Sequence, residues 1–282
     1  MKTLDLLFDG DVVAYRASSA VQKDIDWGDG LWTCHAYLED AIDQFKTIVE
    51  GAKNAVSLYF NTLDTYERVD CYFAFSDPKE NFRKTLDYEY KHNRVGSRKP
   101  TCYYGLVEWV KENYRTLQFP TLEADDVLGI TATDPINKKI NHTPVIISID
   151  KDFKTIPGYF FDFLKEDGGI SFHSPEEAFR NLMVQTLTGD RTDNYKGCPT
   201  YGPVKAKRLI DKTTVNELWD AVVKAFEGQG LTREDALLNY RLAHILWFGE
   251  YDMDAPAMEP ANPVHFIAPN DFLQLKGIVD TP

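Results

Sequence analysis

The sequence has no long apolar run, and this absence excludes a membrane-spanning protein. Its apolar runs, of which Val145–Ile147 is typical, are far shorter than the roughly 18 residues that a transmembrane helix requires. The N-terminus reaches Asp5 and Asp9 before a signal-peptide core could form, and no cleavage site of small residues follows. We therefore expect a cytoplasmic protein.

Metal-binding patterns of cysteine and histidine are also missing. The four cysteines lie far apart with no C-x-x-C pair, which argues against a disulfide framework and against a zinc ribbon. None of the six histidines stands four residues from another or in an H-E-x-x-H pattern. The absence of these patterns argues against chemistry with soft metals.

Positive charge is scarce overall but concentrated locally. The 282 residues include 31 Lys and Arg against 44 Asp and Glu, a formal net charge of -13, which taken alone argues against a nucleic-acid partner. The stretch from Arg83 to Lys99 nevertheless has a local charge of +4, and so does the stretch from Lys196 to Lys212. Each stretch could be a nucleic-acid contact or simply a solvated helix and loop.

Apolar strands alternate with amphipathic helices through the first half of the chain. Strands are predicted at 4–8, 69–75 and 144–150. Helices are predicted at about 12–20, 36–52, 106–114 and from 122 onward. Because no tight hairpins join these strands, the pattern predicts an α/β fold with a parallel sheet, whose site lies at the carboxyl ends of the strands.

The later sequence predicts different architecture. An edge hairpin is expected from 159–163 and 170–173. Beyond Gly189, short helices are predicted at about 203–210, 215–226 and 233–247, followed by an irregular, proline-containing tail. We therefore divide the chain into an α/β domain at 1–189 and a helical region with a tail at 190–282.

Acidic residues gather where this topology would bring them together. They are Asp9 and Asp11 after the first strand, Asp150 and Asp152 after the third, Glu123, Asp125 and Asp126 on a helix, and Asp190 and Asp193 beyond. So many carboxylates in one crevice would repel one another unless cations neutralised them, and oxygen ligands without His or Cys indicate Mg²⁺ or Mn²⁺. An isolated acidic pair is more often a helix cap or a surface charge, and residues 188–194 could form a helix end with an Asx turn.

Four blocks of sequence carry a family resemblance. They are Phe8-Asp9-Gly10, Leu122-Glu123-Ala124-Asp125-Asp126, Ser148-Ile149-Asp150-Lys151-Asp152 and Gly189-Asp190-Arg191-Thr192-Asp193-Asn194. In this order they resemble the 5′ nuclease family of phage exonucleases, flap endonucleases and the 5′ nuclease domains of bacterial polymerases. The resemblance covers about residues 4–211. It implies a PIN-like central sheet, mostly parallel and flanked by helices, with a C-terminal helical DNA-binding region of helix-hairpin-helix type.

The resemblance also implies a ligand set for two Mg²⁺ ions, with Mn²⁺ as an alternative. Carried over by motif, Glu123, Asp125, Asp150 and Asp152 would surround one ion, and Asp9, Asp152, Asp190 and Asp193 the other. Asp126 would be an outer supporting acid. A further family aspartate falls at Ser76 in this register, so Asp77, one residue later, is the nearest candidate. Asp11 has no counterpart, and we expect it to cap a helix.

The first basic stretch resembles the basic arch of the family, here residues 80–105, through which single-stranded 5′ ends pass. The resemblance implies that Lys91 and Arg94 act at the scissile phosphate and that Tyr90 stacks on a base. Arg83 and Lys84 are included as further DNA contacts.

The second basic stretch contains Gly197–Ala206, which resembles a helix-hairpin-helix turn that grips phosphates without reading bases. The expected contacts with duplex DNA are Lys196, Gly197, Gly202, Lys205, Lys207 and Arg208. Thr200 stands where the family usually has glycine, and Lys205 comes one residue late. A K⁺ ion, common in this turn, is therefore an open expectation.

The sequence predicts a metal-dependent 5′→3′ exonuclease or flap endonuclease that hydrolyses DNA phosphodiesters by a two-metal mechanism. We expect a monomer that acts in phage DNA replication or recombination. Two alternatives stay open: a PIN-type ribonuclease and a non-catalytic, structure-specific DNA-binding protein. The arch-like segment and residues 197–206 favour DNA over RNA, and the complete set of acids favours catalysis.

Overall fold

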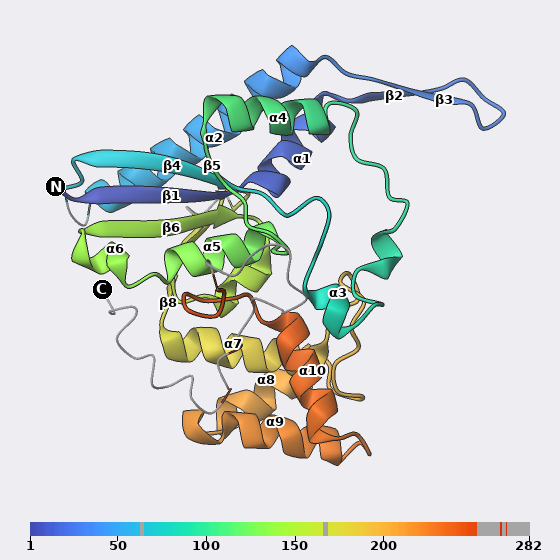
Figure 1. The fold of residues 1–282 in the computed structure, drawn as a ribbon, viewed down its shortest axis with the longest axis vertical. Helices are drawn as coiled ribbons and strands as arrows, with labels where there is room; N and C mark the ends of the chain where they lie inside the picture. The colour runs from blue at the N-terminus through green and yellow to red at the C-terminus, as the bar shows by residue number, and fades with distance from the viewer. Residues whose placement is uncertain (63–64, 166–168, 253–265, 267–268, 270–282) are drawn as a thin grey trace.

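A six-stranded sheet forms the centre of the molecule. The computed structural model describes residues 1–62, 65–165, 169–252, 266 and 269. The strands lie in the order β5-β4-β1-β6-β7-β8 (Figure 1). They are β1 (Thr3–Asp9), β4 (Arg68–Ala74), β5 (Arg115–Leu117), β6 (His142–Ser148), β7 (Gly158–Asp162) and β8 (Ile170–His173). Every neighbouring pair is parallel except β7 and β8, which form the predicted edge hairpin. The predicted, mostly parallel α/β sheet is confirmed.

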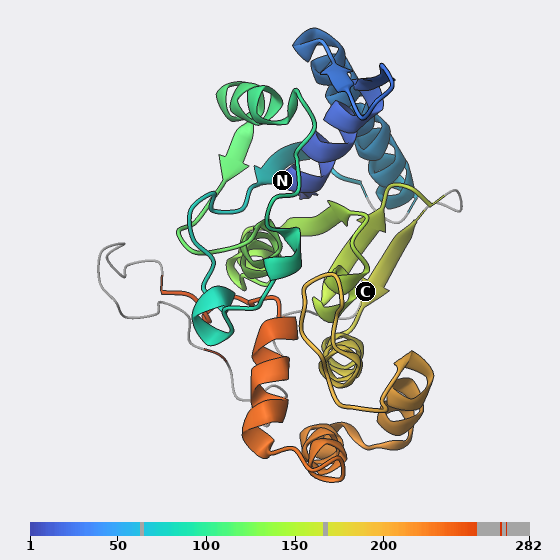
Figure 2. The same ribbon diagram turned by 90° about the vertical axis from the view of Figure 1, so that its right-hand side faces the viewer.

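The strands bury both faces because their apolar side chains alternate between two cores. Leu6 and Phe8 of β1 point into one core, and Leu7 points into the other. The first core is covered by α1 (Gly10–Val21), α2 (Leu38–Asn61) and α4 (Tyr103–Asn113). The second is covered by α5 (Ala124–Ala132), the 3₁₀ turn η2 (Lys151–Thr155) and α7 (Pro175–Thr188). In Figure 2 the blue N-terminal helices lie above the sheet, and the orange C-terminal helices lie below it.

The C-terminal helices share the second core. They are α8 (Pro203–Lys212), the 3₁₀ turn η3 (Val215–Glu217), α9 (Leu218–Glu227) and α10 (Arg233–Ala243). One continuous apolar cluster runs from Leu7 on β1 through Leu182 on α7 to Phe226 on α9. The core therefore has no break at residue 189, and the division into two regions there stays a prediction. The predicted tail lies outside the described residues apart from 266 and 269.

Several elements were not predicted from the sequence. They are the hairpin of β2 (Lys23–Asp26) and β3 (Trp32–His35), β5, η2, α7, and the short segments α3 (Arg83–Leu86), η1 (His92–Arg94) and α6 (Ile136–Lys139). The signal for α7 was present, because Ser174 and Glu177 form a reciprocal capping box with Pro175 at the first helical position. Among the described residues, no helix has both the length and the apolar character needed to cross a membrane.

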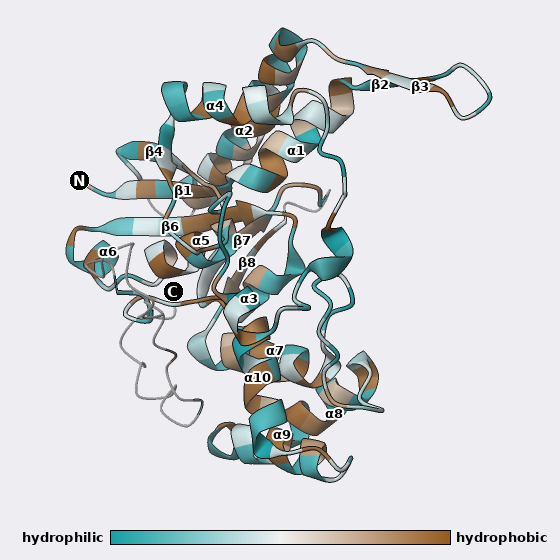
Figure 3. Ribbon diagram, turned by 45° about the vertical axis from the view of Figure 1, so that its right-hand side comes forward, coloured by the Kyte–Doolittle hydropathy of each residue, from teal (hydrophilic) through white to brown (hydrophobic). Residues whose placement is uncertain are grey.

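The β2–β3 hairpin projects from the body of the molecule (Figure 3). It pairs β2 (Lys23–Asp26) with β3 (Trp32–His35), and its strand residues are exposed except for the half-buried Cys34. Gly28, Asp29 and Gly30 in its turn all have positive φ, so the two glycines are suited to this conformation. The hairpin extends the surface beside the C-terminal end of α1 and the end of the arch segment, and contributes no side chain to either core.

A tightly packed glycine gives a test of this packing. A Cβ at Gly129 on α5 would lie 2.4 Å from the carbonyl oxygen of Leu246, whereas a Cβ at Gly51 on α2 would meet nothing within 4 Å. We expect Gly129→Ala to lower the free energy of unfolding by about 1–3 kcal/mol through overpacking. The control, Gly51→Ala, should raise it by about 0.5–1 kcal/mol by favouring the helix. Urea unfolding measures both, and equal shifts would contradict the packing described.

Candidate active site

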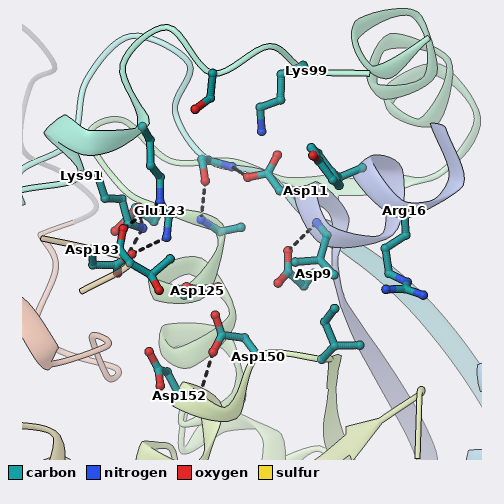
Figure 4. A pocket seen from close by; sticks show the side chains of 18 of the residues that line it. Asp9, Asp11, Arg16, Lys91, Lys99, Glu123, Asp125, Asp150, Asp152 and Asp193 are labelled. Carbon is teal, nitrogen blue, oxygen red and sulfur yellow. Dashed lines mark hydrogen bonds and ion pairs between the residues drawn. The ribbon is translucent and has the colours of Figure 1, made fainter. Parts of the chain in front are cut away.

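A cleft of about 900 Å³ opens at the carboxyl ends of β1 and β6. Seven of the nine predicted metal ligands line it, together with Asp11. Its acidic lining is Asp9, Asp11, Glu123, Asp125, Asp150, Asp152, Asp190 and Asp193. Its cationic lining is Arg16, Lys91, Arg94, Arg98, Lys99 and Lys151. Figure 4 shows Lys91 on one side of the acids and Arg16 on the other. The sheet topology therefore does bring together the acids that are distant in sequence.

The end of β1 positions Asp9 at the bottom of the cleft. Asp9 is buried, and its carboxylate accepts hydrogen bonds from the Val12 N–H at 3.1 Å and the Ser148 hydroxyl at 2.9 Å. Asp9, rather than Asp11, is therefore the N-cap of α1, and the expectation for Asp11 is corrected. Asp11 instead accepts from the Ser76 N–H at 3.0 Å and the Tyr103 hydroxyl at 2.7 Å, which joins three segments at the cleft wall.

The end of β6 supplies the next two acids. β6 pairs in parallel with β1, so Ile147 lies opposite Phe8 and the residues that follow each strand meet at one edge. Asp150 caps η2 by accepting the N–H of Asp152 at 2.9 Å, and this turn directs Asp152 to the same cleft.

Helix α5 begins with a capping box between Glu123 and Asp126. Because Asp125 lies between them, its side chain leaves the helix on another side and lines the cleft. Glu123 also lines the cleft, whereas Asp126 is fully buried behind it.

For three of the cleft acids, the nearby cations do not offset the effects of burial and of neighbouring carboxylates on the pKa. Burial and the charges of Asp11 and Asp150 raise the pKa of Asp9 to about 7. Burial and Asp150 raise the pKa of Asp152 to about 7, and burial, Asp9 and Asp150 raise the pKa of Asp125 well above its usual range. A divalent cation with oxygen ligands would remove this repulsion, so the donor set fits Mg²⁺ or Mn²⁺. Within the described part of the chain, no three Asp, Glu, His or Cys side chains already converge on one metal position.

The arch segment closes against two of the acids. Lys91 forms ion pairs with Glu123 and, at 3.5 Å, with Asp193, and Arg94 forms an ion pair with Asp193. Burial alone would raise the pKa of Glu123, but Lys91 and Arg83 lower it to about 2. The backbone N–H of Lys91 also donates to the Asp193 carbonyl at 2.8 Å, with Lys91 at a φ of 55°. Both predicted catalytic cations therefore lie in the cleft, held by predicted metal ligands.

Arg83 occupies a different place from the one predicted. Its guanidinium is buried and forms hydrogen bonds of 2.6 and 2.7 Å with both oxygens of Asp126, and it also donates to the carbonyls of Leu242 and His244. The prediction that Arg83 contacts DNA is therefore wrong, because the side chain is enclosed. Asp126 has both oxygens engaged by Arg83 and lies outside the cleft lining, so it supports the site from behind rather than facing a metal.

Two further predicted residues lie elsewhere. Tyr90 is only 2% exposed, and its hydroxyl lies 2.9 Å from Glu123 and 3.1 Å from Asp193, so its ring cannot stack on a base as predicted. Asp77 accepts from the Lys79 and Thr121 N–H groups and is not part of the cleft. Ser76 lines the cleft instead, in the register that the family pattern indicated. Lys84 is exposed outside the cleft, and its DNA contact stays a prediction.

The second basic segment lies on the surface of the helical region. Its cations Lys196, Lys205, Lys207 and Arg208 are exposed, as is Gly202, the N-cap of α8. Gly197 is buried, and a Cβ there would lie 2.3 Å from the Gly189 nitrogen, so this glycine allows a close backbone approach rather than contact with DNA. Thr200 has a φ of 66°, the conformation that glycine would adopt more easily. The K⁺ site in this turn stays a prediction.

Sequence reasoning missed the cations on the α1 side of the cleft. Arg16, Arg98 and Lys99 line it but were not assigned to the site. Their signal was weak. Arg16 stands two helical turns after Asp9, and the other two end the first basic stretch.

Comparisons with known proteins find relatives of this chain among exonucleases. A family model described as the N-terminal, resolvase-like domain of 5′-3′ exonucleases matches residues 5–159. The chain is 31% identical to an exodeoxyribonuclease of Enterobacteria phage T3 and 30% identical to an exonuclease of Escherichia phage T7. In each case 88% of this chain and 89% of the relative are covered. Its fold resembles the flap endonuclease of bacteriophage T5, solved in a pseudo-enzyme–product complex with DNA and metal ions. That likeness has a TM-score of 0.56, with 16% identity over 85% of this chain and 88% of the other.

A double-mutant cycle tests the contact behind the cleft. Arg83→Met should lower the free energy of unfolding by about 3–5 kcal/mol, because it leaves the Asp126 carboxylate buried without its partner. The double variant Arg83→Met, Asp126→Leu should lose clearly less than the sum of the single variants. The exposed neighbour Lys84→Met is the control and should change little. Additive losses in urea unfolding would show that the two side chains do not depend on each other.

Proposed function

The chain belongs to the 5′-3′ exonuclease family and is a 5′-3′ exodeoxyribonuclease or flap endonuclease, and we propose that it hydrolyses DNA at free or flapped 5′ ends with two Mg²⁺ ions. The observation that carries this proposal is that eight carboxylates line one cleft together with cations on its walls. The carboxylates suit divalent cations and the cations suit phosphates. Hydrolysis of a phosphodiester requires both.

The two ions would be held by the two sets of acids that the family resemblance implies. One set is Glu123, Asp125, Asp150 and Asp152, and the other is Asp9, Asp152, Asp190 and Asp193. Bound ions supply an activated water molecule and stabilise the charge on the attacking and leaving oxygens. Mn²⁺ accepts the same ligands and is the alternative. The raised pKa values of Asp9, Asp125 and Asp152 support this assignment, because these carboxylates repel one another most.

Lys91 and Arg94 would bind the phosphate that is cut. Each now pairs with a carboxylate inside the cleft, so each can exchange that partner for a phosphate oxygen without leaving the site. A cation placed there offsets the charge that develops on the phosphoryl oxygens. Tyr90 would act indirectly, since its hydroxyl holds Glu123 and Asp193 in position.

The exposed cations of the second basic segment would grip duplex DNA away from the cleft. Lys196, Lys205, Lys207 and Arg208 surround the N-terminus of α8, where backbone N–H groups also favour phosphate. In this assignment, residues 80–105 would bind the single-stranded 5′ end of the DNA, and residues 190–282 would bind the duplex.

Relatives favour DNA over RNA as the substrate. The phage T3 relative is named an exodeoxyribonuclease, which argues against the alternative of a PIN-type ribonuclease. A non-catalytic DNA-binding role would not require the full set of cleft acids. We place the activity in phage DNA replication or recombination, carried out by a monomer in the host cytoplasm.

The acids of the cleft can be tested against an acid outside it. Asp152→Asn should abolish cleavage of 5′-flap DNA in Mg²⁺, because it removes a charge shared by both proposed ligand sets. Asp77→Asn is the control and should cut normally, since Asp77 lies outside the cleft and the amide oxygen can still accept one of the two backbone hydrogen bonds. DNA binding in EDTA should persist in both variants. Cleavage by Asp152→Asn within about tenfold of wild type would contradict the metal assignment.

The duplex contacts can be tested by salt dependence. A variant with Lys205→Ala and Lys207→Ala should flatten the slope of log affinity against log salt by about 0.9 for each phosphate that is no longer bound. Its cleavage rate at saturating enzyme should change little. Lys46→Ala with Lys53→Ala on α2 serves as the control and should leave the slope unchanged. An unchanged slope with a collapsed cleavage rate in the α8 variant would place this segment in the active site instead.

A further inference from the structure

A group of cations on the α1 side of the cleft takes no part in the mechanism described so far. Arg16 projects from α1, and Arg98 and Lys99 come from the end of the arch segment. In Figure 4 Arg16 and Lys99 lie on the side of Asp9 and Asp11, away from Lys91 and Asp193. The cleft therefore has a second cationic wall, separated from the first by the acids.

This second wall has no carboxylate partner among the described residues. Arg16 is half-buried, yet its guanidinium makes no hydrogen bond or ion pair within the part of the chain that the structure describes. Lys99 lies over the rings of Tyr103 and Tyr15, with its nitrogen 4.5 and 5.5 Å from their centres. Arg98 donates to the sulfur of Cys34 at 3.1 Å. Positive charge that is not neutralised inside a cleft attracts an anion.

A smaller cavity of about 350 Å³ continues from the cleft at this wall. Tyr15, Ser19, Arg98 and Lys99 line both spaces, so the two join along these side chains. Gln22 and, from the β2–β3 hairpin, Asp24 and Cys34 also line the smaller space. The one carboxylate among them, Asp24, accepts a hydrogen bond from the Gln22 side chain at 2.9 Å. A DNA strand that crosses the acids would therefore reach a cationic recess beside the hairpin.

We propose that Arg16, Arg98 and Lys99 form a site for the terminal 5′-phosphate of the DNA substrate. This proposal rests on the nuclease function proposed above and adds a preference for phosphorylated ends. A terminal phosphate monoester carries a charge of about −1.5 to −2 near neutral pH, against −1 for an internal phosphodiester. Three cations without carboxylate partners favour the more highly charged group, and a guanidinium can hold it through two hydrogen bonds.

The test compares duplexes that differ only in a 5′-phosphate or a 5′-hydroxyl at the recessed end. Binding is measured in EDTA, and the first cut is measured in Mg²⁺ under single-turnover conditions. Wild type should bind and cut the phosphorylated end about tenfold better. Arg16→Gln and the exposed Lys99→Gln, checked for folding by thermal unfolding, should each reduce this ratio toward one. The control Lys53→Ala should retain it.

The outcomes separate this inference from the proposed function. If wild type treats both ends alike, or if both Gln variants keep the full preference, the phosphate site is wrong although the nuclease function stands. If wild type cuts neither end, the nuclease function fails, and the binding comparison in EDTA still tests the site. A 5′-phosphorylated dinucleotide should compete better than inorganic phosphate at equal concentration. Equal competition would identify a site for free phosphate and overturn the assignment to a DNA end.

Discussion

The buried ion pair between Arg83 and Asp126 is the contact on which the shape of the cleft depends. Arg83 lies near the start of the arch segment and Asp126 in the first turn of α5. Both also bond to the backbone at the end of α10 and in the turn after it, at Leu242, His244 and Leu246. Removing one member of a buried ion pair leaves the other charge buried without its partner, which strongly destabilises the fold. Three segments that are distant in sequence are therefore held together, and Glu123 at the start of α5 is held with them. The helical region thus takes part in shaping the active site even though it contributes few residues to the cleft.

The cleft divides its acids into two groups by the charges around them. Glu123 and Asp193 are paired with Lys91 and Arg94, and the pKa of Glu123 is lowered accordingly. Asp9, Asp125 and Asp152 are shielded from water and lie near other carboxylates, and both effects raise their pKa values. A divalent cation would bring its largest electrostatic gain to this second group. The same arrangement places Lys91 and Arg94, which would bind phosphate, beside carboxylates, and the proposed hydrolysis uses this combination.

The sequence predicted the sheet and its acidic edge because these depend on local patterns. Apolar runs such as Leu6–Phe8 followed by Asp9 mark a buried strand with a carboxylate at its end, and parallel pairing then brings such ends together. Arg83, Tyr90 and Asp77 were misplaced because nothing local distinguishes a buried cation or phenol from an exposed one; their contacts lie with α5, residue 193 and the segment near Thr121. The role of Asp9 as the cap of α1 was missed because Asp11, two residues later, offered an equally suitable side chain. Arg16 was missed because its importance depends on the cleft that it lines.

If the acids of this cleft bind two divalent cations, as we propose, calorimetric titration of the DNA-free protein with Mn²⁺ will detect them. We expect two ions bound per chain, and weakened binding of both in Asp152→Asn, because Asp152 belongs to both ligand sets. Asp77→Asn should bind as wild type does. Binding of no ion, or two-ion binding that is unaffected by Asp152→Asn, would show that these acids do not form the proposed two-metal site.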